Sequence, residues 1–281
     1  MILEKKIQSA TEILRNYNIP SSRLDAEIII SNILGLKREN LITNGQMIIN
    51  NKIIKEYDSA IYRRLKREPV AYIVGKKEFW SQDFIVNSST LVPRPETEIL
   101  IYKIVKIFKD KKINVLDIGT GSGCIILSIL KELKFSKGIG IDISSKAIKI
   151  AKENSKKMKL SNRVSFKVRN LDAISGNKFD LIVSNPPYIA RHQLKNLDTG
   201  IKKFEPKLAL DGGNDGLDVM RKVIYKSRKI LKINGMLALE IGNGQYKKVS
   251  QILKFNKFNE KFLISDYKNN IRCILSVLNH Y

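Results

Sequence analysis

Four consecutive residues have side chains and carbonyls that could hold a flat nitrogen group: Asn185, Pro186, Pro187 and Tyr188. They follow residues 179–184, a short apolar run that predicts a buried parallel strand. Ligands in open α/β sheets bind at the carboxyl ends of such strands. The Asn185 oxygen and a proline carbonyl could accept both hydrogens of an NH2 group, and Tyr188 offers an aromatic face. We therefore predict a site for a planar amine or amide here.

A glycine-rich stretch upstream is a second candidate site, made of Gly119, Thr120, Gly121, Ser122 and Gly123. It follows residues 114–118, which predict another buried strand, and a helical pattern begins after it. Glycines permit positive φ and let a ligand approach the backbone closely. Dinucleotide sites usually carry G-x-G-x-x-G, whereas the third glycine here comes one residue early. This spacing favours S-adenosylmethionine, which has no pyrophosphate.

An acidic residue ends the next predicted strand. Asp142 closes the run 138–142 and lies 19 positions after Gly123, where a carboxylate can accept both hydroxyls of a ribose. A strand-ending aspartate is also common in the N-cap region of the next helix. Because glycine loop, acid and N-P-P-Y fall in order at the ends of three predicted strands, we interpret them together as a site that methylates a planar nitrogen.

These motifs need a sheet that brings strand ends together. From about residue 91 strands and helices alternate, which predicts an α/β domain with a mostly parallel, Rossmann-like sheet. The last two strands leave no room for a crossover helix and should pair antiparallel. Residues 1–70 predict a small helical domain and residues 71–90 a β-hairpin connector, so the third domain covers 91–281.

Composition excludes several classes of protein. With 281 residues and 43% hydrophobic content, the chain can bury a core, yet no apolar stretch reaches the ~20 residues of a membrane helix. The first residues lack the apolar region of a secretion signal, so we expect a cytoplasmic protein without a membrane partner. His192 and His280 are the only histidines and the two cysteines form no C-x-x-C pair, so we expect no metal.

The net charge of +24 is the main indication of a nucleic-acid partner. It is compatible with weak contact to RNA or the ribosome through a basic surface. Lysine pairs are spread along the chain rather than gathered in one arm, so a lysine-rich composition on solvated helix faces would also explain the charge. The sequence leaves both interpretations open.

The chain resembles, nearly end to end, the family of N5-glutamine methyltransferases that modify class I peptide-chain release factors. Besides the glycine loop and N-P-P-Y, the agreement covers a P-R-P-E-T-E segment at residues 93–98 and shorter stretches at 23–27, 204–206, 209–213 and 240–242. The resemblance implies a class I methyltransferase domain whose last sheet strand is antiparallel, and an N-terminal helical domain that contacts the release factor. It also implies that the methyl acceptor is the glutamine of a Gly-Gly-Gln loop. We expect a monomer.

By motif, the resemblance places residues 119–123 around the aminoacyl part of S-adenosylmethionine and Asp142 on its ribose. Asn185, with the Pro186 carbonyl, would grip the glutamine amide and also touch the cofactor, while Pro187 and Tyr188 complete the catalytic motif. Asn170 stands where the family often has an acidic residue near the adenine. The P-R-P-E-T-E segment would close over the site or cap the helix that follows, and Arg272 is expected to be structural.

Two other functions remain open. A nucleic-acid amino-methyltransferase acting on adenine N6 or guanine N2 would present the same planar NH2 group to the same motif. The P-R-P-E-T-E segment and the lack of a recognisable RNA-binding module in the first 70 residues argue against it. A non-catalytic module that docks on translation partners would leave the glycine loop, Asp142 and Asn185 without a chemical use.

Overall fold

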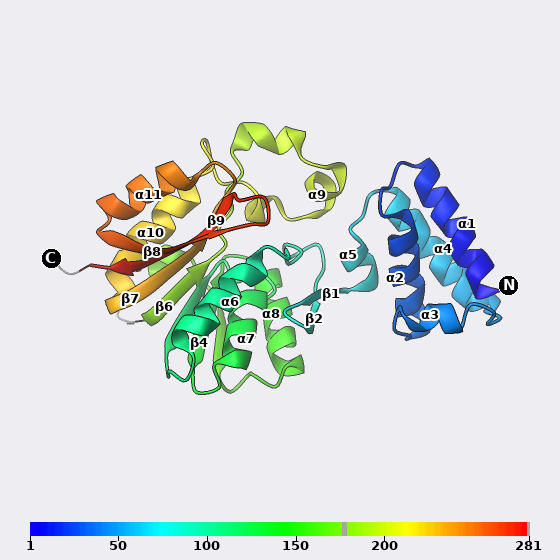
Figure 1. Cartoon of the computed structure of the whole chain (residues 1–281), viewed down its shortest axis with the longest axis horizontal. Helices are drawn as coiled ribbons and strands as arrows, with labels where there is room; N and C mark the ends of the chain where they lie inside the picture. Colours follow the sequence, from blue (N-terminus) through cyan, green and yellow to red (C-terminus); the bar gives the residue numbers. More distant parts are fainter. Residues whose placement is uncertain (176–178, 280–281) are drawn as a thin grey trace. The chain divides into compact units, whose positions relative to one another are not determined.

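The computed structural model describes residues 1–175 and 179–279, so His280 lies outside the described residues. The chain divides into two compact units (Figure 1). One unit contains Met1–Lys76 together with Asp198–Phe204, and the other contains Lys77–Leu197 and Glu205–Tyr281. The predicted limits 1–70, 71–90 and 91–281 stay a prediction.

The first unit is helical. It contains α1 (Leu3–Asn16), α2 (Ser22–Leu34), α3 (Asn40–Thr43), α4 (Asn51–Leu65), α5 (Val70–Val74) and the distant α9 (Thr199–Phe204). Helix α1 buries residues at three- and four-residue spacing, namely Leu3, Ile7, Ala10 and Leu14. Asn50 caps α4 by accepting the Ile53 N–H at 3.0 Å. Apolar periodicity and one polar cap thus explain the main helices of this unit.

The predicted connector is only partly a hairpin. Strands β1 (Lys76–Phe79) and β2 (Gln82–Ile85) form a two-stranded sheet, and Trp80 and Ser81 between them both have positive φ, as a type I′ turn requires. The first residues of the predicted connector, 71–74, belong instead to α5. Pro69 precedes this helix and Gly75 ends it in the left-handed conformation. An apolar run of five residues cannot by itself distinguish a strand from a short helix.

The second unit contains a seven-stranded sheet. Its strands are β3 (Asn114–Ile118), β4 (Lys137–Asp142), β5 (Val164–Val168), β6 (Phe179–Ser184), β7 (Leu231–Glu240), β8 (Phe258–Ser265) and β9 (Ile271–Leu278). They lie in the order β5-β4-β3-β6-β7-β9-β8, with parallel pairing from β5 to β7. Strand β9 is antiparallel to both of its neighbours. The prediction of a mostly parallel sheet with an antiparallel last strand is confirmed.

Helices cover both faces of this sheet (Figure 1). One hydrophobic core packs α6 (Thr97–Phe108), α7 (Cys124–Glu132) and α8 (Ser145–Lys157) against one face, and another packs α10 (Asp218–Ile230) and α11 (Tyr246–Phe255) against the other. Three short 3-10 segments lie in the loops: η1 (Leu171–Ala173), η2 (Arg191–Asn196) and η3 (Lys207–Ala209). Within the residues described, no helix has both the length and the apolar character required to cross a membrane.

Candidate functional site

The strand order reverses between β3 and β6, which are neighbours in the middle of the sheet. Such a switch point opens a crevice at the carboxyl ends of the strands. Ser184, the last residue of β6, donates its hydroxyl to the Ile118 carbonyl of β3 at 2.8 Å and ties the two strand ends together. The glycine loop starts directly after β3 and Asn185 directly after β6. The structure therefore brings the two predicted motifs to one edge of the sheet.

The glycine loop is fixed by its backbone. Gly119, Gly121 and Gly123 have φ values of 71°, 55° and 80°. The N–H groups of Gly119 and Thr120 both donate to the Ile141 carbonyl at 2.9 Å. A Cβ on Gly119 or Gly121 would meet nothing within 4 Å, whereas one on Gly123 would press on three side chains at 3.1–3.3 Å. The first two glycines therefore face open space where a ligand can approach the backbone, and the third packs inward.

Asp142 ends β4 beside this loop. Its Oδ2 accepts the Gly121 N–H at 3.0 Å and its Oδ1 accepts the Ser144 N–H at 2.9 Å. Burial raises the pKa of the Asp142 carboxyl, and these backbone N–H groups act in the opposite direction. Each carboxylate oxygen has a further lone pair. The side chain can therefore hold the loop and still accept a ligand hydroxyl.

Two buried oxygens next to the glycine loop have no hydrogen-bond partner among the described residues, Asp117 Oδ1 and Ser122 Oγ. The other Asp117 oxygen accepts the Thr120 hydroxyl at 2.7 Å. Asp117 is 1% exposed, and its burial raises the pKa of the carboxyl to about 7. The sequence pattern assigned Ser122 to the site but not Asp117. A carboxylate inside an apolar strand was the signal that could have identified it, because buried charges are rare.

Asn170 follows β5 at the same edge of the sheet. The preceding residue, Arg169, donates its N–H to the Asp142 carbonyl at 2.9 Å, so this stretch lies beside the end of β4. The Asn170 side chain is exposed and accepts the Asp172 N–H at 3.1 Å as the N-cap of η1. The structure thus gives Asn170 a local capping role, and its contact with adenine stays a prediction.

The N-P-P-Y loop is held in place by backbone pairing. Ile189, the next residue, exchanges two backbone hydrogen bonds with the segment 210–212, at 3.1 and 2.9 Å. Pro186 is buried, whereas Asn185, Pro187 and Tyr188 are half-buried. Within the described part of the chain, nothing donates a backbone hydrogen bond to the Pro186 carbonyl. This carbonyl therefore keeps its lone pairs for another donor.

Tyr188 is fixed at both ends. Its carbonyl accepts a hydrogen bond from Gln245 Nε2 at 2.9 Å, and its hydroxyl accepts one from the Arg272 guanidinium at 3.4 Å. The guanidinium carbon lies 5.9 Å from the centroid of the tyrosine ring. Burial raises the pKa of the Tyr188 hydroxyl, which therefore stays protonated at neutral pH. Arg272 was expected to be structural, but β9 carries it to the N-P-P-Y motif.

A buried carboxylate lies beside Asn185. Glu240 ends β7 and is 1% exposed. It follows Leu239, the register partner of Ser184, just as Asn185 follows Ser184. Its Oε2 accepts the Thr97 hydroxyl at 2.5 Å, while its Oε1 is buried without a hydrogen bond from any described residue. Burial raises the pKa of Glu240, and the side chains of Thr97, Arg272 and Asn185 lower it. The sequence pattern did not assign Glu240 to the site, because only the strand register reveals its position.

The P-R-P-E-T-E segment connects to the strand ends. Arg94 donates to Glu205 Oε1 at 2.7 Å, and Glu205 Oε2 accepts the Val92 N–H at 3.4 Å. The Glu205 side chain is only 1% exposed, so this ion pair is half enclosed by protein. Helix α6 begins at Thr97 without a side-chain cap. The expected capping role is therefore wrong, and Thr97 bonds to Glu240 instead.

One buried asparagine of α8 links the hairpin to the glycine loop. Asn154, which is 1% exposed, donates to the carbonyls of Ile85 and Ser122 at 3.0 and 2.9 Å. It also accepts the Ile85 N–H at 2.7 Å. Strand β2 and the glycine loop are thus held by the same side chain.

Comparison with known proteins identifies relatives over nearly the whole chain. Residues 6–75 match the PrmC N-terminal domain and residues 109–277 match a methyltransferase domain. The release factor glutamine methyltransferase of Caulobacter vibrioides is 34% identical over 99% of this chain and 97% of its own length. The protein of the same name from Clostridium acetobutylicum is 36% identical over 99% of both chains.

Solved structures share the fold at low sequence identity. A methyltransferase from Pyrococcus furiosus matches with a TM-score of 0.54 and 16% identity, over 78% of this chain and 98% of its own. The hMettl16 catalytic domain in complex with MAT2A 3'UTR hairpin 6 matches with a TM-score of 0.59 and 13% identity, over 82% of this chain and 83% of its own. The predicted Rossmann-like methyltransferase fold is confirmed.

Proposed function

The chain belongs to the family of release factor glutamine methyltransferases, and we propose that Asn185 and the Pro186 carbonyl hold the amide that receives the methyl group. The enzyme transfers a methyl group from S-adenosylmethionine to a glutamine of a release factor. The observation that carries the proposed site is the meeting of the glycine loop and the N-P-P-Y loop at the β3–β6 switch point. A cofactor and an acceptor bound to these loops would lie side by side.

The residues at this edge fit S-adenosylmethionine. Gly119 and Gly121 leave open space above the backbone, and Asp142 keeps lone pairs for ribose hydroxyls. The unpaired oxygens of Asp117 and Ser122 lie next to the same loop. We propose that residues 119–123 hold the aminoacyl part, that Asp142 holds the ribose and that Asn170 borders the adenine. When bound, the cofactor supplies a methyl group on a sulfonium sulfur, which becomes a neutral thioether once nitrogen takes the methyl.

The protein has to position a weak nucleophile, the amide nitrogen of the acceptor glutamine. An amide nitrogen reacts poorly because its lone pair is delocalised into the carbonyl. Asn185 Oδ1 and the Pro186 carbonyl would each accept one N–H, which fixes the nitrogen and raises its electron density. The Tyr188 ring would cover the flat amide. Catalysis is then mainly positioning, with reacting atoms held ~3–3.5 Å apart.

The proton balance requires no strong base. As the nitrogen takes the methyl group it becomes positively charged, and one of its two protons becomes very acidic. The acceptor oxygens of Asn185 and Pro186 hold both protons, and the one that is lost passes to water. A catalytic histidine is therefore unnecessary, in agreement with a chain that has only two histidines.

Further proposals concern the partner. The P-R-P-E-T-E segment and the match to the PrmC N-terminal domain support a class I release factor as substrate, with the glutamine of its Gly-Gly-Gln loop as acceptor. We also propose that the enzyme works as a monomer in the cytoplasm. Its net charge of +24 would give a weak, salt-dependent attraction to RNA or the ribosome.

The deciding experiment is transfer of labelled methyl from S-adenosylmethionine to a purified class I release factor. A Gly-Gly-Gln→Gly-Gly-Ala variant of the factor, bulk rRNA and DNA are tested in parallel. Label on the factor that disappears in the variant is the expected result. Label retained by the variant would show that the methyl acceptor is another residue of the factor. Label on nucleic acid alone would favour a nucleic-acid amino-methyltransferase.

A further inference from the structure

The side-chain amide of Asn185 has two ends of nearly equal shape but opposite polarity. Its oxygen accepts hydrogen bonds and its NH2 group donates them. Only the orientation with the oxygen toward the crevice can receive an N–H of the acceptor glutamine. The opposite orientation would set two donors against each other. An acceptor on the protein that takes the NH2 end of Asn185 would hold this orientation.

We infer that Glu240 is the positioning residue that receives the Asn185 NH2 group and thereby turns the Asn185 oxygen toward the acceptor. This inference rests on the proposed function, because it concerns how Asn185 meets the glutamine amide. Three observations carry it. Glu240 and Asn185 directly follow the paired residues Leu239 and Ser184, the Glu240 carboxylate is buried, and its Oε1 has no other hydrogen bond from the described residues while Oε2 is bound to Thr97.

The polarity of Glu240 is set by its other contacts. A carboxylate without a proton can only accept hydrogen bonds, so it selects the donor end of a neighbouring amide. The Thr97 hydroxyl donates to one oxygen, and Arg272 supplies a positive charge nearby. Burial and the negative charge of Glu96 oppose this stabilisation, because both raise the pKa of Glu240. Leaving a buried carboxylate oxygen unpaired is costly, which gives the Asn185 amide a strong reason to point its NH2 group at Glu240.

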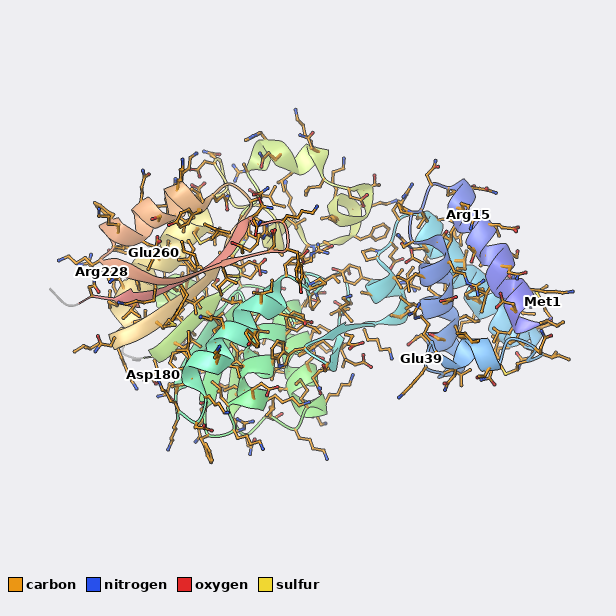
Figure 2. The ribbon with its side chains drawn as sticks, viewed as in Figure 1. Met1, Arg15, Glu39, Asp180, Arg228 and Glu260 are labelled. Carbon is orange, nitrogen blue, oxygen red and sulfur yellow. The ribbon has the colours of Figure 1, made fainter. Side chains whose placement is uncertain are left out.

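The first test changes Glu240→Gln. Thr97 would donate to the introduced amide oxygen, so a new NH2 group would face Asn185 and draw the Asn185 oxygen away from the crevice. We expect kcat to fall at least about tenfold while KM for the release factor and affinity for S-adenosylmethionine change less than about threefold. The matched control is Asp180→Asn on the neighbouring strand β6, because Asp180 (labelled in Figure 2) bonds to the Asn114 N–H and Lys232, away from Asn185. It should leave kcat unchanged.

The second test reverses the polarity of the pair. Asn185→Asp alone would set two carboxylates side by side, whereas Asn185→Asp combined with Glu240→Gln restores one donor and one acceptor. The introduced aspartate would then keep an oxygen toward the acceptor. We expect the double variant to be at least about tenfold more active than Asn185→Asp alone. Its midpoint temperature of thermal unfolding should be the same as that of the wild type. A double variant no better than Asn185→Asp would overturn the inference.

The controls separate this inference from the proposed function. If Asn185→Ala retains methyl transfer, the proposed function of the N-P-P-Y loop fails. If Asn185→Ala abolishes transfer while Glu240→Gln keeps full kcat, only the role of Glu240 fails. If the Glu240→Gln variant does not fold, Glu240→Asp replaces it. This change keeps the carboxylate but places it one methylene farther from Asn185. The same loss of kcat with retained cofactor binding is then expected, and an unchanged kcat would contradict the inference.

Discussion

The two sides of the β3–β6 switch point differ in the parts of the chain that form them, which are backbone groups on one side and side chains on the other. On the β3–β4 side, glycines with positive φ and backbone N–H groups make the loop, which bonds to Ile141 and Asp142. On the β6–β7 side, the half-buried side chains of Asn185 and Arg272 lie at the strand ends, with the buried carboxylate of Glu240 beneath them. Under the proposed function, cofactor binding depends on backbone shape and acceptor chemistry depends on the polarity of side chains. Substitutions on the two sides should therefore affect different steps.

The largest difference between the loss of methyl transfer and the loss of cofactor affinity is expected from Asn185→Ala. The change removes one of the two acceptors for the glutamine amide and leaves the glycine loop intact. Methyl transfer should fall roughly 100- to 1000-fold, as when one preorganised hydrogen-bonding group is lost from an active site. Cofactor affinity, measured by calorimetry, should change less than about threefold. An equal loss of transfer and binding would show that the two sides are not independent.

Asp117→Asn tests the buried charge on the cofactor side. The folded pKa of Asp117 is raised to about 7 by burial, above the value in the unfolded chain. The folded state therefore binds this proton more tightly, and stability decreases as pH rises from about 4 to 7. The asparagine in the variant does not titrate, so the variant does not lose stability in this way. The free energy of unfolding of the variant minus that of the wild type should therefore increase by roughly 1 kcal/mol for each pH unit between about 4 and 7. Denaturant titrations at several pH values measure the difference, and a constant difference would contradict the assignment.

Gly121→Ala tests the backbone side directly. Gly121 has a φ of 55° and faces open space, so a methyl group adds backbone strain and occupies the place proposed for the cofactor. We expect cofactor affinity to fall about tenfold, with a stability loss of about 1 kcal/mol. Gly35→Ala is the matched control, since Gly35 has a φ of 66° with nothing within 4 Å but ends α2 in the helical unit. The control should lose stability without losing cofactor affinity.

The smallest effect is expected from Tyr188→Phe. The hydroxyl makes one long hydrogen bond with Arg272, at 3.4 Å, while the ring and the backbone contact with Gln245 remain after substitution. We expect kcat to change less than about threefold, and Tyr188→Ala to lose much more because the aromatic face is removed. A large loss in the phenylalanine variant would mean that the hydroxyl itself takes part in acceptor binding.

Much of the fold could be predicted because strands and glycine loop have local signals. Residues 114–118 and 179–184 are apolar runs closed by glycine or proline, and both are strands in the structure. Residues 71–74 were assigned to the hairpin connector because Pro69 and Gly75 delimit a helix too short to show a period. Helix α3 has only four residues and was missed for the same reason.

The site was predicted where its residues are contiguous and missed where they are distant in sequence. The glycine loop, Asp142 and N-P-P-Y each carry a local pattern at a strand end. Glu240, by contrast, gains its meaning from the β6–β7 register and from Thr97, which is 143 positions away. Arg272 reaches Tyr188 across 84 positions. A single sequence contains no local signal for such pairs.

The position of β9 determines the order in which this enzyme can assemble. Among the described residues, β8 pairs with β9 alone in the sheet, although β8 comes first along the chain, so β8 cannot join the sheet before β9 is present. The two strands are linked by a tight turn in which Asp266 accepts the N–H groups of Lys268 and Asn270 at 2.9 and 3.0 Å. The contacts within such a hairpin are local in sequence, and hairpins of this kind form fast. Because Arg272 lies in β9, its side chain can reach Tyr188 only once β9 has paired with β7.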